Sequence, residues 1–258
     1  EGIRNVGGLF GRVTSSPYKP NKYWFEDCSV KNVNFADINQ RSGGLIGYYH
    51  SDLSIACNNI TIEGATIGGD RSGGLLGMIH NGADVIDITN TKVSNTTFGG
   101  TSNGGIAGDG RGQFHLVNVL MDSNTYKSGV KQGVLLGEVD TGDNRYSLSA
   151  AGVEVKPGSG KTTSDLPSMV YTTNTAAVNR KTYIAFGDYN GTAAAPNENK
   201  TLYGAGDTAT TATSPYVTTR PVSTLAVRAS DGDTTDRYLF GDGAAIATAA
   251  AIQSEVIQ

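Results

Sequence analysis

The chain has 258 residues and a formal net charge of -4, and only 17% of its residues are charged, against a usual share of roughly 25%. This mildly acidic balance, without basic clusters, argues against nucleic acid or an anionic membrane as the main partner and excludes a charge-laced coiled coil. The sequence has no run of about 20 apolar residues, so we expect no membrane insertion in this segment.

Glycine is abundant, at 35 residues, and part of it is periodic. A five-residue motif, with two leading glycines, two apolar residues and a final glycine, begins at positions 7, 43, 73, 104 and 133. Its leading glycines are Gly7, Gly8, Gly43, Gly44, Gly73, Gly74, Gly104, Gly105 and Gly133, with Val134 replacing the second glycine of the fifth motif. Units of roughly 30 residues are too short to close a core of their own, which is typical of a repeat protein.

Segments 25–35, 55–67 and 86–98, between the motifs, alternate β-branched or aromatic residues with polar ones. This pattern predicts half-buried strands. The fold class that we predict is all-β, a parallel β-solenoid (β-helix) of about 30-residue coils. The leading glycines would form corners that need either a positive φ or room for close backbone approach.

Counting from the glycine motifs predicts one interior column formed by Cys28, Cys57, Ile88 and Val117. Stacked residues would lie about 4.8 Å apart, inside the Cα window of a disulfide. In-register parallel side chains point the same way, however, which strains the dihedral of a bridge. We therefore favour Cys28 and Cys57 as two buried thiols that act as small hydrophobic residues.

The motif Gly-Gly-Leu-apolar-Gly, followed by a Cys or small apolar position 15 to 20 residues later, resembles the GLUG repeat of bacterial surface proteins. The similarity covers residues 1–157. It implies a secreted, adhesin-like protein, since members of that family occur in large adhesin-like proteins and beside the catalytic modules of IgA-cleaving peptidases. The first unit departs from the pattern by an insertion at 18–23.

Two domains are predicted: GLUG-like solenoid repeats over 1–157, and a Thr- and Ala-rich extension over 158–258. The extension begins in a Gly-, Pro- and Ser-rich stretch and contains strand-like runs at 169–172, 182–186 and 222–228. These runs would be final coils or a small β-domain. Residues 244–257 predict a short capping helix. Because the sequence opens inside a repeat, we expect a longer natural chain.

Candidate metal ligands are few. His50 and His80 each follow the last glycine of a motif by three residues and would stack, but Thr14, Arg111 and Asp140 stand at the equivalent positions and supply no third adjacent ligand. We interpret the pair as an exposed ladder. Asp231, Asp233 and Asp236 partly match a calcium loop, although turn chemistry explains them more simply. We predict no cofactor.

We expect no catalytic residue. Glycosidase chemistry needs two converging carboxylates, and Asp52, Asp84, Asp109 and Asp140 follow their motifs at differing offsets. The expected function is that of a structural and adhesive module of a bacterial secreted or cell-surface protein, a rigid stalk that binds a glycan or host protein. The candidate contacts are Tyr18, Tyr23 and Trp24, although Trp24 would serve equally well as a core residue at a coil end. The alternatives are an accessory domain of a large extracellular peptidase or glycan-active enzyme, and a filament subunit that associates through the solenoid ends.

Overall fold

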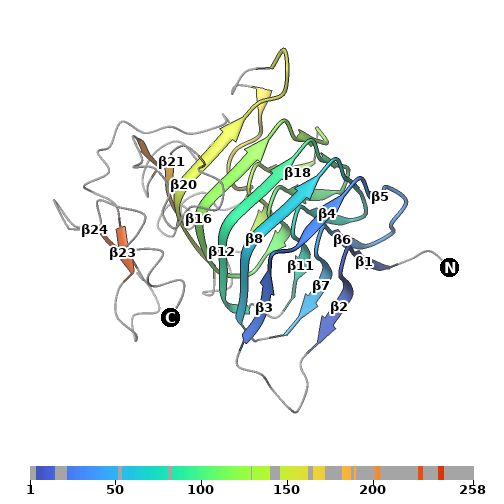
Figure 1. Ribbon diagram of the computed structural model, residues 1–258, viewed down its shortest axis with the longest axis horizontal. Helices are drawn as coiled ribbons and strands as arrows, with labels where there is room; N and C mark the ends of the chain where they lie inside the picture. The colour runs from blue at the N-terminus through green and yellow to red at the C-terminus, as the bar shows by residue number, and fades with distance from the viewer. Residues whose placement is uncertain are drawn as a thin grey trace.

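The computed structural model describes residues 4–14, 22–51, 54–80, 83–128, 130–139, 146–161, 165–171, 182–186 and 189, and the backbone of three further short strands. In these residues the regular structure is almost entirely β-strand, and the strands wind into a parallel solenoid (Figure 1). The predicted fold class is confirmed. The helix predicted at 244–257 lies outside the described residues.

Each coil passes through four parallel sheets, here called A to D in the order in which the chain meets them. Sheets A and B flank the glycine motif. Sheet A contains β1 (Asn5–Gly7), β6 (Arg41–Gly43), β10 (Arg71–Gly73), β14 (Ser102–Gly104) and β18 (Lys131–Gly133). Sheet B contains β2 (Phe10–Thr14), β7 (Ile46–His50), β11 (Leu76–Ile79), β15 (Ala107–Gly110) and β19 (Leu136–Val139).

Sheet C is the widest and carries the long strands. It contains β3 (Lys22–Glu26), β4 (Ser29–Lys31), β8 (Ser54–Glu63), β12 (Ala83–Ser94), β16 (Gly112–Asp122), β20 (Ser147–Lys156), β21 (Thr182–Phe186) and the antiparallel β22 (Thr201–Tyr203). Sheet D contains β5 (Asn34–Phe35), β9 (Thr66–Ile67), β13 (Thr97–Phe98) and β17 (Thr125–Tyr126). A separate antiparallel pair joins β23 (Ala226–Arg228) and β24 (Tyr238–Phe240).

The strand ladder extends past Lys156. The amide groups of Val134 and Leu135 donate to the carbonyl groups of Ser168 and Met169, and β21 pairs with β20 in parallel. The antiparallel β22 then covers the outer edge of β21. At this end of sheet C the parallel stacking therefore stops.

The predicted interior column of Cys28, Cys57, Ile88 and Val117 is wrong at two of its four positions. Cys57 does pair with Ile88, but its partner in the preceding coil is Phe25, and Ile88 pairs with Leu116 in the next. Cys28 lies alongside Ile60, since the Thr61 amide donates to the Cys28 carbonyl.

Unequal corner loops between sheets D and A explain the error. These loops, 36–40, 68–70, 99–101 and 127–130, contain five, three, three and four residues. Counting backward from a glycine motif crosses this loop, so each extra residue shifts the predicted register by one position. The loop shifts the first coil by two residues and the fourth by one. The second shift is the whole offset of Val117 from Leu116, whereas Cys28 lies three residues from Phe25 because it was also counted 15 rather than 16 residues before its motif.

Both cysteines are free thiols, with Cys57 buried and Cys28 half-buried. Burial raises the pKa of the Cys57 thiol well above its usual range, and the neighbouring Cys28 raises it further. A thiol held protonated in this way is a poor nucleophile and packs as a small apolar side chain.

The core is a continuous apolar column along the inside of the coil. Ile55, Ile86, Phe114 and Leu148 occupy one register position in sheet C and are fully buried. The apolar residues of the glycine motifs form a second buried file, Leu45, Leu75, Ile106 and Leu135. Burying each such side chain stabilises the fold by about 1.5–3 kcal/mol, so stacking supplies the core that no single coil could close.

The leading glycines are required by close backbone approach. None of them has a positive φ. A Cβ atom added at Gly44 would lie closer than 3.0 Å to the carbonyl oxygen of Gly74, and one added at Gly74 would meet the carbonyl oxygen of Gly105 in the same way. Of the two explanations for these glycines, a positive φ and close backbone approach, the structure supports the second.

Positive φ values occur instead at a bend inside sheet C. Asp27, Asn59, Asn90 and Asn118 occupy equivalent positions with φ between 48° and 57°, and Gly152 continues the series at 65°. The Asn90 side-chain amide donates to Asn58 Oδ1 at 3.0 Å and accepts from Asn118 Nδ2 at 2.8 Å. Asparagine tolerates the left-handed conformation, and here it also bonds from coil to coil.

Candidate functional site

The corner loops between sheets D and A form a groove on the surface of the solenoid. Its lining residues come from four successive coils: Ile38, Asn39, Gln40, Arg41, Gly69, Asp70, Gly99, Thr101 and Lys127. The groove has a volume of about 550 Å³ and is open to solvent. It spans three strand steps, about 14 Å along the solenoid axis.

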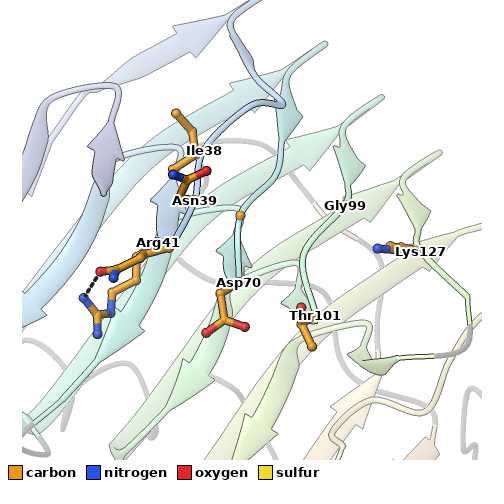
Figure 2. A pocket seen from close by; sticks show the side chains of 9 residues that line it. Ile38, Asn39, Arg41, Asp70, Gly99, Thr101 and Lys127 are labelled. Carbon is orange, nitrogen blue, oxygen red and sulfur yellow. Dashed lines mark hydrogen bonds between the residues drawn. The ribbon is translucent and has the colours of Figure 1, made fainter. Parts of the chain in front are cut away.

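The chemistry of this corner groove is polar. Amide, hydroxyl and charged side chains surround it, and Ile38 is its one large apolar lining residue among those described. In Figure 2 Asp70 lies between Arg41 and Lys127, with Thr101 beside it. The lining therefore offers donors and acceptors along an extended path and no deep apolar pocket.

Carboxylates hold one of the two arginines that begin sheet A strands. Arg71 pairs with Asp70, and its Nε donates to Asp109 Oδ2 at 2.8 Å. Asp109 is buried, which raises its pKa, while the nearby Arg111 and Arg71 oppose that shift. This network crosses from one coil to the next and fixes the Asp70 side of the groove.

Arg41, at the equivalent position in the preceding coil, has a different environment. Its guanidinium carbon lies 4.1 Å from the centroid of the Tyr48 ring, and its Nε donates to Met78 Sδ at 3.0 Å. Arg41 Nη1 donates to Asn5 Oδ1 and to Gln40 Oε1. All of these partners are uncharged.

Tyr48 is the centre of a cluster on the outer face of sheet B. Arg12, on β2, has its guanidinium carbon 5.4 Å from the centroid of the Tyr48 ring. The His50 ring stacks on the Tyr48 ring with 5.5 Å between centroids, and the His80 ring meets the Tyr48 ring edge-on at 5.8 Å. We call Arg12, Arg41, Tyr48, His50 and His80 the Tyr48 cluster. It adjoins the corner groove, because Arg41 belongs to both.

The predicted stacking of His50 and His80 is confirmed. Thr14 pairs with His50, the His80 amide donates to the Tyr49 carbonyl, and the two imidazole rings lie 4.9 Å apart. Both side chains are half-buried rather than exposed. Among the described residues no group of three or more metal-ligating side chains occurs, so the pair has no third ligand of this kind.

Two of the three candidate contact residues, Tyr23 and Trp24, lie on opposite faces of β3. Tyr18 lies outside the described residues. Tyr23 points inward from β3 and packs edge-on against Tyr49 at 6.1 Å, whereas the neighbouring Trp24 is 64% exposed on the outer face. Lys22 Nζ lies 4.8 Å from the Trp24 ring. Consecutive strand residues point to opposite faces, and this separates Tyr23 from Trp24.

A charged cluster lies on the outer face of sheet C. Lys22 pairs with Asp87, and Asp87 Oδ1 lies 3.0 Å from His115 Nδ1. Asp87 and His115 are each 2% exposed, and Ser149 follows them in register on β20. Buried charges of this kind are retained when they are paired, so the cluster fixes the orientation of three strands.

Among the remaining acidic candidates, only Asp109 has a side chain that the structure describes. Asp109 is held by arginines, and Asp52, Asp140 and the side chain of Asp84 lie outside the described residues. The calcium segment with Asp231, Asp233 and Asp236 also lies outside them. The described part of the chain therefore brings no pair of these candidate carboxylates together.

Sequence reasoning missed the corner groove and the Tyr48 cluster. A signal was present in the sequence around the glycine motif. A basic residue stands two positions before three of the motifs, and an aromatic, thioether or acidic residue stands seven positions after that basic residue. These pairs are Arg41 and Tyr48, Arg71 and Met78, and Lys131 and Glu138. The tight turn of the motif brings such positions side by side, as the Arg41–Tyr48 and Lys131–Glu138 contacts show. The groove itself had no such signal, because its shape depends on loop lengths.

Comparison with known proteins finds no matching family model, no matching curated protein and no matching solved structure. Among the described residues, none of the helices has the length and apolar character that crossing a membrane requires.

Proposed function

We propose that this chain is a non-catalytic structural and adhesive module of a bacterial secreted or cell-surface protein, a rigid stalk that presents a ligand-binding groove. The observation that carries the proposal is the corner groove, an open polar channel built from four coils. The extracellular setting is supported by the resemblance of the glycine motif to the GLUG repeat of bacterial surface proteins.

The solenoid suits a stalk because each coil bonds to the next along its whole length. Backbone ladders join the coils in all four sheets, and the fully buried apolar files continue from one coil to another. A quasi-one-dimensional fold of this kind resists bending and projects a surface away from its attachment point.

The groove suits an extended polar ligand. Asp70 accepts hydrogen bonds, Arg41 and Lys127 donate them, and the side chains of Asn39, Gln40 and Thr101 contribute further polar atoms. A chain of hydroxyl-bearing sugar units can use all of these groups along the three strand steps. We therefore propose a glycan as the ligand of the corner groove.

Filling the groove tests this proposal. The wild-type chain is first tested on an array of glycans and host-matrix proteins. Thr101→Trp places an indole among the lining residues, and we expect it to abolish binding to the array ligands that the wild type binds. Thr125→Trp is the matched control, because Thr125 is exposed on the outer face of sheet D and does not line the groove. Equal retention of ligand by both variants would contradict the groove as the binding site, and uniform lack of binding by the wild type would favour a pure spacer.

Self-association through the N-terminal end is a second candidate function, favoured by a specific observation. Leu9 and Phe10 are 45% and 48% exposed, although the equivalent Leu45 and Ile46 are fully buried. The first strands of sheets A and B, β1 and β2, have no partner on their outer side among the described residues. Open strand edges beside exposed apolar side chains favour pairing with another chain.

The prediction for self-association concerns how the molecular mass in solution depends on protein concentration. If two copies meet through this end, sedimentation of the wild-type chain yields a dimer at high concentration, and Leu9→Lys yields a monomer with an unchanged melting temperature. Lys31→Glu, on the exposed outer surface of sheet C, is expected to leave the dimer intact. A wild-type chain that remains monomeric throughout would refute this second candidate.

A further inference from the structure

The Tyr48 cluster carries positive charge that no described carboxylate neutralises. Arg41 contacts sulfur, amide oxygens and an aromatic ring, and Arg12 lies over the same ring. In the part of the chain that the structure describes, neither arginine forms an ion pair. The next coil differs, since Asp70 and Asp109 hold its Arg71. On this surface, the described arginines without a carboxylate partner are therefore Arg12 and Arg41, in the first two coils.

The histidines of the cluster experience this charge. His50 has its pKa lowered by partial burial, and then by His80, Arg12 and Arg41. All three of these neighbours disfavour a further positive charge on the His50 ring. Two arginines that have no carboxylate partner among the described residues gain from an external anion.

The cluster and the corner groove are continuous. Arg41 lines the groove, and its guanidinium group also covers Tyr48 on the outer face of sheet B. A ligand lying in the groove would therefore reach the cluster at the end formed by the first coil. Planar guanidinium groups are suited to carboxylate and sulfate oxygens, which they bind through two parallel hydrogen bonds.

We propose that the Tyr48 cluster binds the acidic groups, carboxylate or sulfate, of an anionic polysaccharide whose chain continues into the corner groove. This inference rests on the proposed function and adds the charge class of its ligand. A polysaccharide is favoured over an acidic peptide because the groove is lined by amide, hydroxyl and charged side chains and has no pocket for apolar side chains. A transition metal is disfavoured by the surrounding arginines.

Binding is expected to depend on pH. Partial burial and the neighbouring positive charges hold the pKa of His50 below its ordinary value, and a bound anion opposes that shift, so affinity rises as pH falls toward the lowered pKa of His50. The groups that face His50 are Arg12 and Thr14 on β2, Arg41 on β6, Tyr48 on β7 and His80 directly after β11, with Asp109 on β15 and Arg111 directly after β15 lying beyond. The His50→Gln variant is expected to lose most of this pH dependence.

The experiment uses three probes on the full chain: dextran sulfate, polygalacturonate and neutral dextran. Titration calorimetry at pH 5.5 and 8 is expected to show binding of at least one acidic polymer, weaker at high salt, and no comparable binding of dextran. Arg12→Gln is expected to weaken that binding by about tenfold, as loss of a charge-assisted hydrogen bond would. Lys31→Gln removes the same charge from an exposed pair with Glu63 on sheet C and is expected to leave affinity unchanged.

The sulfate and uronate arms identify which acidic group is bound. Equal weakening by Arg12→Gln and Lys31→Gln would mean nonspecific attraction and would overturn the inference. Polyglutamate that binds as tightly as the polysaccharides, or a melting temperature that Ni²⁺ raises in the wild type but not in His80→Gln, would overturn it as well. If only neutral glycans bind, and Thr101→Trp abolishes that binding, the proposed function stands and this inference fails. If nothing binds, both fail.

Discussion

Gly74→Ala is expected to destabilise the protein by about 3 kcal/mol or more, enough to unfold a domain of ordinary stability on mild heating. The added methyl group would overlap the Gly105 carbonyl oxygen of the next coil, and that oxygen belongs to rigid backbone. Relief requires the two coils to separate, which would weaken the bond from the Gly74 amide to the Gly104 carbonyl. Urea denaturation followed by circular dichroism measures the change.

Gly99→Ala is the matched control for that experiment. Gly99 lies in a corner loop of the following coil, has no positive φ, and a Cβ atom there would lie 3.8 Å from its nearest neighbours. Alanine at this position should therefore change the free energy of unfolding by less than about 1 kcal/mol, because it alters only the conformational entropy of the unfolded chain. If both variants unfold at the same denaturant concentration, close approach of coils is not the reason for the glycine motif.

Asn90→Ala is expected to lower the free energy of unfolding by about 2–4 kcal/mol. Alanine at φ 48° is strained, and its methyl group leaves the buried Asn118 Nδ2 without its acceptor at this position. Asn90→Gly removes the strain and keeps the loss of the hydrogen bonds, so it should be more stable than Asn90→Ala by about 1 kcal/mol. Urea midpoints of the two variants separate the two contributions.

Asn95→Ala provides the comparison for Asn90→Ala. Asn95 has a nearly equal φ of 50° but is exposed and makes no side-chain hydrogen bond within the described residues. Its replacement should cost only the backbone strain, about 1 kcal/mol. Equal losses at positions 90 and 95 would show that the bonds between Asn58, Asn90 and Asn118 contribute little to the stacking of coils.

The architecture could be predicted because one requirement repeats in every coil. At the leading glycines an added Cβ atom would overlap backbone oxygen atoms, in most cases of the next coil, so the motifs mark equivalent points of the winding. The register of sheet C could not be counted from those points. Its position depends on the loop between sheets D and A, and nothing in the composition of 36–40 reveals that this loop holds two residues more than the loops 68–70 and 99–101.

The arrangement of the candidate contacts could not be derived from the sequence for a related reason. Tyr23 and Trp24 are adjacent in the sequence, but strand alternation places them on opposite faces. Arg41 and Tyr48, seven residues apart, meet because a tight turn folds the chain back between them. Chemistry in a solenoid is assembled across turns and across coils, so neighbours along the chain are a poor guide to a site.

The corner loops have a consequence for how such a surface diversifies. Loops of three, four and five residues are accommodated at the same corner while the flanking strands keep their pairing partners. An insertion there changes the outline of the channel without moving the packed interior. Recognition and mechanical strength are thus encoded in separate parts of each winding, so related chains can acquire new specificities while retaining the same shaft.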